Sequence, residues 1–327
     1  IKTITCPSNL YGNVIEPWYY ATRPYAFEAT LSGAITGSAV LTKAGAGTLT
    51  LSNTGNSSAA ATLTVTAGTL SVASDSRLVG GAVTLNGGTL NLNNAGTIDN
   101  AVTLGASNGT ISVTNGTGTL SGNITGTGSL TKTGGQLLTL SGTNTYSGGT
   151  TVRGAGMSVT SGANLGTGAV ALESDLTITG TATVSNAIAL NADATITNAN
   201  AVTLSGVLSG SNVLTKAGAG TLTLSGTNTH TGTVTVSAGG LTLEGGGSIG
   251  DSSAVTVVSG ATLTLIGGNE TIGSLTGAGN VVLSYNLTTG GDNSSTTFSG
   301  VISSTNTSGI VKTGTGTLTL SGANTYT

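Results

Sequence analysis

The stretch GTLTLSNTGNSSAAATLTVTAGTLSVASDSRLVGGAVTLNGGTLNL, residues 47–92, repeats one short segment and decides the fold. GTLTL begins at Gly47, GTLSV at Gly68 and GTLNL at Gly88, so the segment returns after 21 and then 20 residues. Apolar and polar residues alternate within it, which in a β-strand sends Leu and Val to one face and Thr, Ser and Asn to the other. Gly and Asn gather between the segments, where tight corners need positive φ. This period predicts one coil of a β-solenoid.

The same period continues along the chain, with GTISV at Gly109 and GTLTL, GLTL and GATLTL at Gly220, Gly240 and Gly260. Stacked coils place equivalent strands side by side in parallel, and such crossover connections are right-handed in most proteins. We therefore predict an all-β fold, a right-handed parallel β-helix with about 20 residues per coil. The solenoid is expected over residues 31–327, after a distinct segment over residues 1–30.

Composition excludes several classes of protein. Charged residues make up 6% of the 327 residues, too few for an ordinary globular domain, while abundant Leu, Val and Ile argue against disorder. The net charge of -3 comes from single, scattered residues, so neither a nucleic-acid partner nor a polybasic membrane anchor is indicated. No apolar run is long enough to insert into a membrane as a helix. With a single cysteine, a disulfide framework and a multi-cysteine metal site are excluded.

A longer period is marked by lysine. Four of the five lysines occupy one motif position, at Lys43, Lys132, Lys216 and Lys312. The surrounding stretches begin at residues 31, 120, 204 and 298 and share the pattern LTKxGxGTLTLSGxNTY. The first copy lacks the SGxNTY part, the second reads GGQLL for GxGTL, the third has His230 in place of Tyr, and the fourth stops before SGGTTV. A row of lysines could bind a ligand, but the wide spacing fits inheritance of a repeat better.

These four stretches resemble the autotransporter-associated β-strand repeat of bacterial passenger domains and other large surface proteins. The resemblance covers about a third of the chain and implies a secreted β-helix at the cell surface, so we expect an extracellular or surface location. It transfers no catalytic residue, because the motif is structural.

The sequence offers little for catalysis. Some parallel β-helices act on polysaccharides with paired carboxylates, and the best pair here is Glu173 and Asp175, two residues apart and so expected on one face of a strand. We favour a solvated surface pair, since no Arg or aromatic residue accompanies them. His230, the only histidine, is expected at a surface corner. The glycine-rich strings at Gly45 and Gly245 are expected to form turns, since they lack the ending of a phosphate loop. We expect no catalytic residue, no metal site and no cofactor.

Residues 1–30 hold nearly all of the bulky chemistry, including the only Trp, all three Pro and the lone Cys6. Large aromatic residues are typical anchors of interfaces. The expected assembly interface consists of Trp18, Tyr19, Tyr20, Tyr25, Phe27 and, near the other end of the chain, Tyr326. The segment either caps its own first coil or binds the last coil of a neighbouring copy.

Three functions follow in order of preference. The first is a non-catalytic extracellular structural protein, the subunit of a bacterial surface fibre or layer that assembles head to tail with copies of itself through the N-terminal segment. The second is an adhesin passenger domain of an autotransporter, with a surface glycan or protein as ligand. The third is a polysaccharide-active β-helix enzyme.

Overall fold

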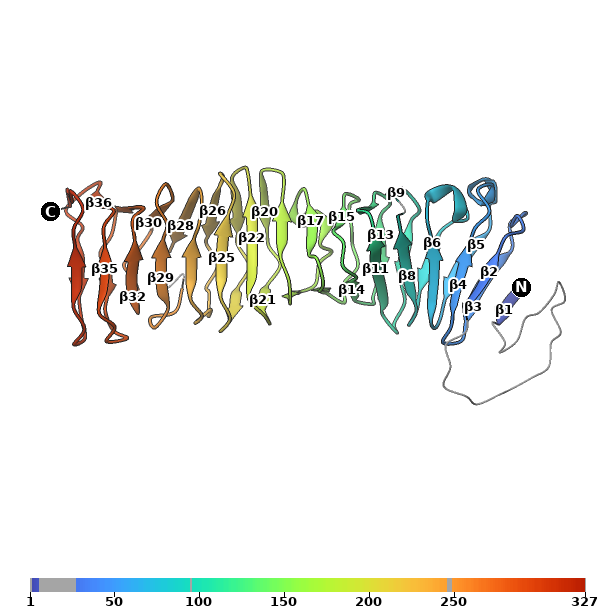
Figure 1. Cartoon of the computed structure of the whole chain (residues 1–327), viewed down its shortest axis with the longest axis horizontal. Helices are drawn as coiled ribbons and strands as arrows, with labels where there is room; N and C mark the ends of the chain where they lie inside the picture. Colours follow the sequence, from blue (N-terminus) through green and yellow to red (C-terminus); the bar gives the residue numbers. More distant parts are fainter. Residues whose placement is uncertain (1, 6–27, 95, 246–248, 327) are drawn as a thin grey trace. The chain divides into compact units, whose positions relative to one another are not determined.

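The computed structural model describes residues 2–5, 28–94, 96–245 and 249–326 of the chain. These residues fall into two compact units, Ile1–Met157 with Gly166–Gly168, and Ser158–Leu165 with Ala169–Thr327. Each unit is a parallel β-solenoid with about 20 residues per coil, and strands from successive coils lie side by side within it (Figure 1). The predicted all-β solenoid is therefore confirmed, while its right-handed winding stays a prediction.

The first unit builds three parallel sheets, because each strand pairs with its equivalent in the next coil. One sheet has the order β1 (Lys2–Thr5), β3 (Val40–Ala44), β5 (Thr62–Val65), β7 (Val83–Leu85), β10 (Val102–Leu104) and β13 (Ile124–Gly126). The next has the order β2 (Glu28–Leu31), β4 (Thr48–Leu51), β6 (Thr69–Val72), β8 (Thr89–Asn93), β11 (Gly109–Asn115), β14 (Leu130–Thr133) and β16 (Thr150–Val152). A shorter one contains β9 (Gly96–Ile98), β12 (Gly118–Leu120) and β15 (Leu138–Leu140).

The second unit repeats this plan. One sheet contains β18 (Val170–Leu172), β21 (Ile188–Leu190) and β24 (Leu208–Gly210). A second sheet contains β19 (Leu176–Ile178), β22 (Ala194–Asn198), β25 (Leu214–Ala217), β27 (Val234–Val236), β29 (Ala254–Val257), β32 (Ser274–Gly277), β35 (Thr296–Phe298) and β38 (Leu318–Leu320). The other two contain β20 (Ala182–Val184), β23 (Val202–Leu204), β26 (Thr221–Leu224), β28 (Gly240–Glu244), β30 (Thr262–Ile266), β33 (Asn280–Leu283) and β36 (Val301–Ser304); and β31 (Glu270–Ile272), β34 (Leu287–Thr289) and β37 (Ile310–Lys312). Strand β17 (Met157–Val159) and the 3-10 turns η1 (Asn56–Ser58), η2 (Asp75–Arg77) and η3 (Gly162–Asn164) complete the elements.

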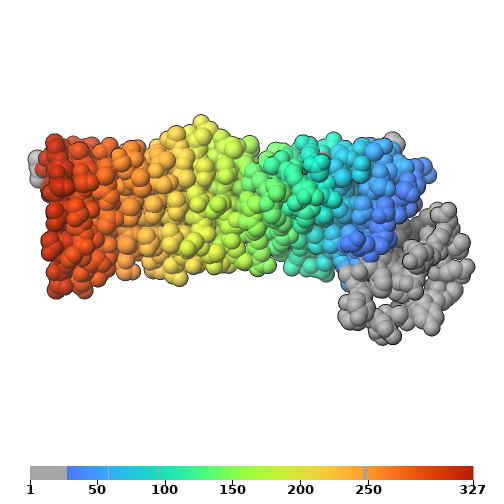
Figure 2. Space-filling view, viewed as in Figure 1, coloured from blue at the N-terminus to red at the C-terminus, as the bar shows by residue number. Residues whose placement is uncertain are grey.

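Register stacks like residues on like. In the first unit, Leu49 pairs with Leu70 and Leu70 with Leu90, and all three side chains are buried. In the second unit, Leu222 and Leu224 face the core as the alternation predicts, whereas Thr221 on the same strand is exposed. Neighbouring coils follow one another in sequence order, seen within each unit as successive bands of colour (Figure 2). The apolar interior is thus a set of ladders, each extended by one side chain per coil.

Corners use glycine where backbones meet. Gly68 has φ of +65°, and a Cβ on it would come within 2.4 Å of the carbonyl oxygens of Gly45 and Gly47 in the preceding coil. Any larger residue would both strain its own backbone and push the coils apart. Gly45 and Gly245, which begin the two glycine-rich strings, also lie in corners with positive φ, as predicted.

The first residues add a strand to the chain's own first coil. Strand β1 pairs in parallel with β3, with Lys2 opposite Leu41 and Thr5 opposite Ala44. Strand β2 begins at Glu28, just before the expected boundary at residue 31.

Candidate functional site

The repeat lysines occupy inward positions of their strands. In Leu214-Thr215-Lys216 of β25, the leucine and the lysine are buried while the threonine between them is partly exposed. Lys43 and Lys132 are likewise fully buried. An accessible ligand-binding row is therefore wrong for these three lysines. The reason is parity, since Lys lies two residues after an inward Leu.

Each buried ammonium group is enclosed by backbone carbonyls. Nζ of Lys216 donates hydrogen bonds to the carbonyl oxygens of Ala217 at 2.8 Å, Gly218 at 2.8 Å and Ala238 at 3.0 Å. The first two carbonyls belong to its own corner, and the third belongs to the following coil. The other two lysines show the same pattern, with Lys43 contacting Ala44 at 3.1 Å, Gly45 at 2.7 Å and Ala67 at 3.0 Å, and Lys132 contacting Gly134 at 3.1 Å and Arg153 at 3.4 Å.

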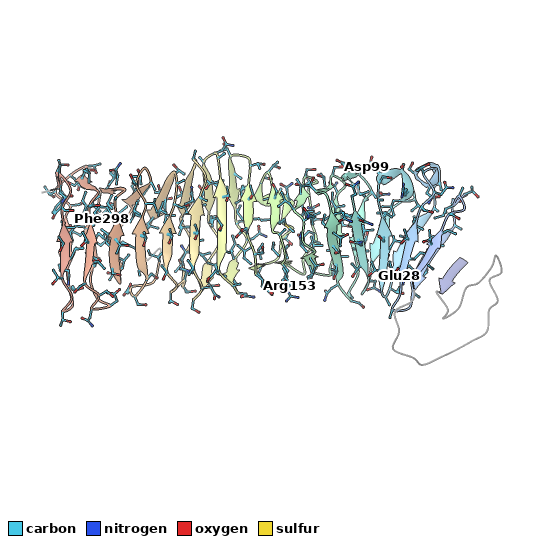
Figure 3. All side chains as sticks on the ribbon, in the orientation of Figure 1. Glu28, Asp99, Arg153 and Phe298 are labelled. Carbon is cyan, nitrogen blue, oxygen red and sulfur yellow. The ribbon has the colours of Figure 1, made fainter. Side chains whose placement is uncertain are left out.

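These contacts offset the cost of burying a charge. An ammonium removed from water loses several kcal/mol of hydration, whereas hydrogen bonds to a charged group contribute about 1.5–3 kcal/mol each. Burial lowers the pKa of Lys132 and of Lys216 to about 8, so both groups remain mostly protonated at neutral pH. The backbone carbonyl of Arg153 accepts a hydrogen bond from Lys132, while the residue itself lies exposed at its corner (Figure 3).

A repeated asparagine makes the opposite contact. Oδ1 of Asn228 accepts a hydrogen bond at 2.6 Å from the backbone N–H of Leu208, which lies one coil earlier. The same bond runs from Ile124 to Asn144 at 2.7 Å and from Ile302 to Asn324 at 2.8 Å in two other copies. In the first copy, which lacks the SGxNTY part, Asn56 accepts the corresponding bond from Ile35 at 2.9 Å. The three buried lysines therefore bind the following coil, and the asparagines bind the preceding one. The motif is visible in the sequence, whereas neither of these backbone contacts could be read from it.

The last residue of the motif is also interior. Tyr146 is fully buried, and its hydroxyl lies 2.6 Å from Oγ1 of Thr150. Burial raises the pKa of Tyr146 to about 12, with the bond to Thr150 acting in the opposite direction. His230, the equivalent residue of the third copy, is fully buried as well. The predicted surface corner for His230 is therefore wrong, because this position of the corner points inward while Thr229 beside it is exposed.

The carboxylate pair does not form a strand-face site. Glu173 and Asp175 lie in the corner between β18 and β19, so the expected alternation along a strand does not apply to them. Asp175 is exposed, and its Oδ1 accepts a hydrogen bond at 2.7 Å from the backbone N–H of Thr195 in the next coil. A surface role in the corner fits this geometry.

Over the described ranges, no group of three or more His, Cys, Asp or Glu side chains is placed to hold a metal ion. None of the helical turns described is long and apolar enough to cross a membrane.

The expected assembly interface is mostly untested. Cys6, Trp18, Tyr19, Tyr20, Tyr25 and Phe27 lie outside the described residues. Tyr326 is described and is half-buried in the last coil. The interface therefore stays a prediction.

Comparison with known proteins bears on the lysine-centred repeats. A family model described as the passenger-associated-transport-repeat matches residues 41–72, 130–157, 214–243 and 310–327. Each matched stretch contains one of the four repeat lysines. No curated protein and no solved structure matches the chain. The four lysine-centred stretches are thus similar to the passenger-associated-transport-repeat, and together the matched stretches cover about a third of the chain.

Proposed function

We propose that this chain is a non-catalytic passenger solenoid of the autotransporter type, displayed outside the cell as a structural scaffold. The observation that carries the proposal is the set of four family repeats, each of which supplies a lysine and an asparagine to its corner. In all four copies these contacts are structural, and Glu173 and Asp175, the carboxylates considered for catalysis, lie in the corner between β18 and β19.

A scaffold role is favoured over direct ligand binding. Hot spots of interfaces are enriched in Trp, Tyr and Arg, and large exposed apolar patches mark docking sites. Among the described residues, exposed large apolar side chains are mostly single valines, with Tyr285 as the exposed aromatic. The alternative of an adhesin needs ligand-binding residues other than these scattered side chains. The alternative of head-to-tail fibre assembly depends on the aromatic segment, which lies outside the described residues.

Surface display can be tested with antibodies against the purified solenoid. Intact cells of the native host should be labelled as strongly as permeabilised cells, and external protease should remove the signal. A cytoplasmic protein serves as the control for membrane integrity. Labelling that appears only after permeabilisation would contradict the proposed location.

A further inference from the structure

The third repeat places an imidazole where the second places a phenol. His230 and Tyr146 are both fully buried at equivalent corners. The hydroxyl of Tyr146 has Thr150 as its partner, but Val234 occupies the equivalent of Thr150 in the third repeat. Register supports this equivalence, since Thr150 pairs with Leu130 and Val234 pairs with Leu214 at the start of the two matching strands. The substitution of Tyr by His is thus accompanied by loss of the polar partner.

The hydrogen bonds of His230 assign its neutral tautomer. Nε2 lies 2.9 Å from the carbonyl oxygen of Asn212, and a carbonyl can only accept, so Nε2 carries the hydrogen. Nδ1 is then the unprotonated nitrogen. It is buried, and no residue in the described part of the chain offers it a hydrogen-bond partner.

Protonation would place a second N–H at Nδ1, next to a corner that supplies no described acceptor. A buried charged ring with one of its two N–H groups unpartnered is costly, so the folded corner favours the neutral ring. The backbone of His230 also joins two coils, because its carbonyl accepts a hydrogen bond at 2.7 Å from the N–H of Gly250 in the following coil. The buried ring and this contact between coils therefore belong to one residue.

Charged neighbours do not compensate for this. Within the described ranges, the titratable or charged side chains on this coil and on the nearby coils are Asp193, Lys216, Glu244, Asp251 and Glu270. Lys216 is held by its carbonyls, Asp193 accepts the N–H of Val213, and Glu270 accepts the N–H of Ile249. The pKa of His230 is lowered by burial, and only the bond to Asn212 acts in the opposite direction.

We propose that His230 makes the third repeat an acid-sensitive corner, whose coil loosens from its neighbours when the imidazole is protonated, while Tyr146 keeps the second repeat closed. This goes beyond the proposed scaffold function and does not depend on surface display. Because the pKa is lower in the folded than in the unfolded chain, the unfolded state binds more protons below the ordinary value of 6.5. The contribution of neutral His230 to the free energy of unfolding is therefore complete above pH 6.5, and it is lost as the pH falls towards the folded-state pKa.

The experiment compares the wild-type protein with His230→Tyr/Val234→Thr, which copies the residues of the second repeat. Between pH 6.5 and the folded-state pKa, the unfolding equilibrium constant of the wild type should rise relative to the variant by up to about tenfold for each pH unit. Hydrogen exchange at Thr231 and Gly250 should accelerate in acid in the wild type alone. Equal acid sensitivity of the two proteins would overturn the proposal.

A second measurement does not depend on the variant. His230 is the only histidine, so its imidazole signals can be followed in an NMR titration without assignment. We expect a midpoint below 6.5, accompanied by changes at the corner. A midpoint at or above 6.5 in the folded protein would also refute the proposal, even if the variant failed to fold.

Discussion

Lys216 and Lys312 occupy the same position of the repeat within the second unit, but only Lys216 is enclosed. Lys216 is fully buried and reaches the carbonyl of Ala238 in the following coil. Lys312 is exposed, and its hydrogen bonds among the described residues go to Thr313 and Gly314 of its own corner. The burial and the hydrogen bonds of the motif lysine therefore depend on the following coil, as expected for repeat proteins, in which each repeat is stabilised by its neighbours.

The largest effect is expected in the apolar ladder of an enclosed coil. Leu222→Asp would bury a carboxylate between Val202 and Leu241 and should lower the free energy of unfolding by at least about 4 kcal/mol. Leu320→Asp in the last coil should cost less than half as much, because Leu320 is only half-buried. Urea unfolding followed by circular dichroism measures both.

If Leu222→Asp yields no folded protein, Leu222→Ala should still cost about 2–5 kcal/mol. Thr221→Asp on the exposed face is the matched control, with an expected change within about 0.5 kcal/mol. Similar losses for Leu222→Asp and Leu320→Asp would remove the distinction between the two coils.

The comparison of the two lysines can be tested directly. Lys216→Met keeps the length of the side chain but leaves three corner carbonyls without their donor, so we expect a loss of about 1–3 kcal/mol in the free energy of unfolding. Lys312→Met should change it by no more than about 0.5 kcal/mol. An equal cost for both variants would show that the following coil contributes nothing to the corner.

The pH dependence of this difference has a defined sign. Burial lowers the pKa of Lys216 to about 8, against an ordinary value of 10.5. Between these values the unfolded state binds more protons, so raising the pH favours the folded wild type. Its advantage over Lys216→Met should therefore widen from pH 8 to pH 10.5, and a narrowing gap would contradict the assignment.

The coils could be predicted from the sequence because apolar residues alternate with polar ones along each strand, and the apolar ones, such as Leu222 and Leu224, are those that become buried. The same parity in Leu-Thr-Lys could have placed Lys216 inside, but lysine is rarely buried without a partner. Its partner is the backbone of Ala238, 22 residues away, and a backbone carbonyl leaves no signature in the sequence. His230 was misplaced for a related reason, since corner residues follow no simple alternation. The assembly role of the aromatic segment before residue 28 remains a prediction.

The smallest loss in the free energy of unfolding is expected for the motif asparagine, which bonds to the preceding coil. Asn228→Ala would leave the buried N–H of Leu208 without an acceptor and should cost about 1–2 kcal/mol. Asn324 makes the same bond to Ile302 even in the last coil, where its lysine counterpart has lost its outer contact. Asn324→Ala should therefore still cost about 1 kcal/mol, unlike Lys312→Met. Hydrogen exchange at the amides of Leu208 and Ile302 identifies the bond that is lost in each variant. If Asn324→Ala were as silent as Lys312→Met, the last coil would simply be loose as a whole, and the opposite directions assigned to lysine and asparagine would be wrong.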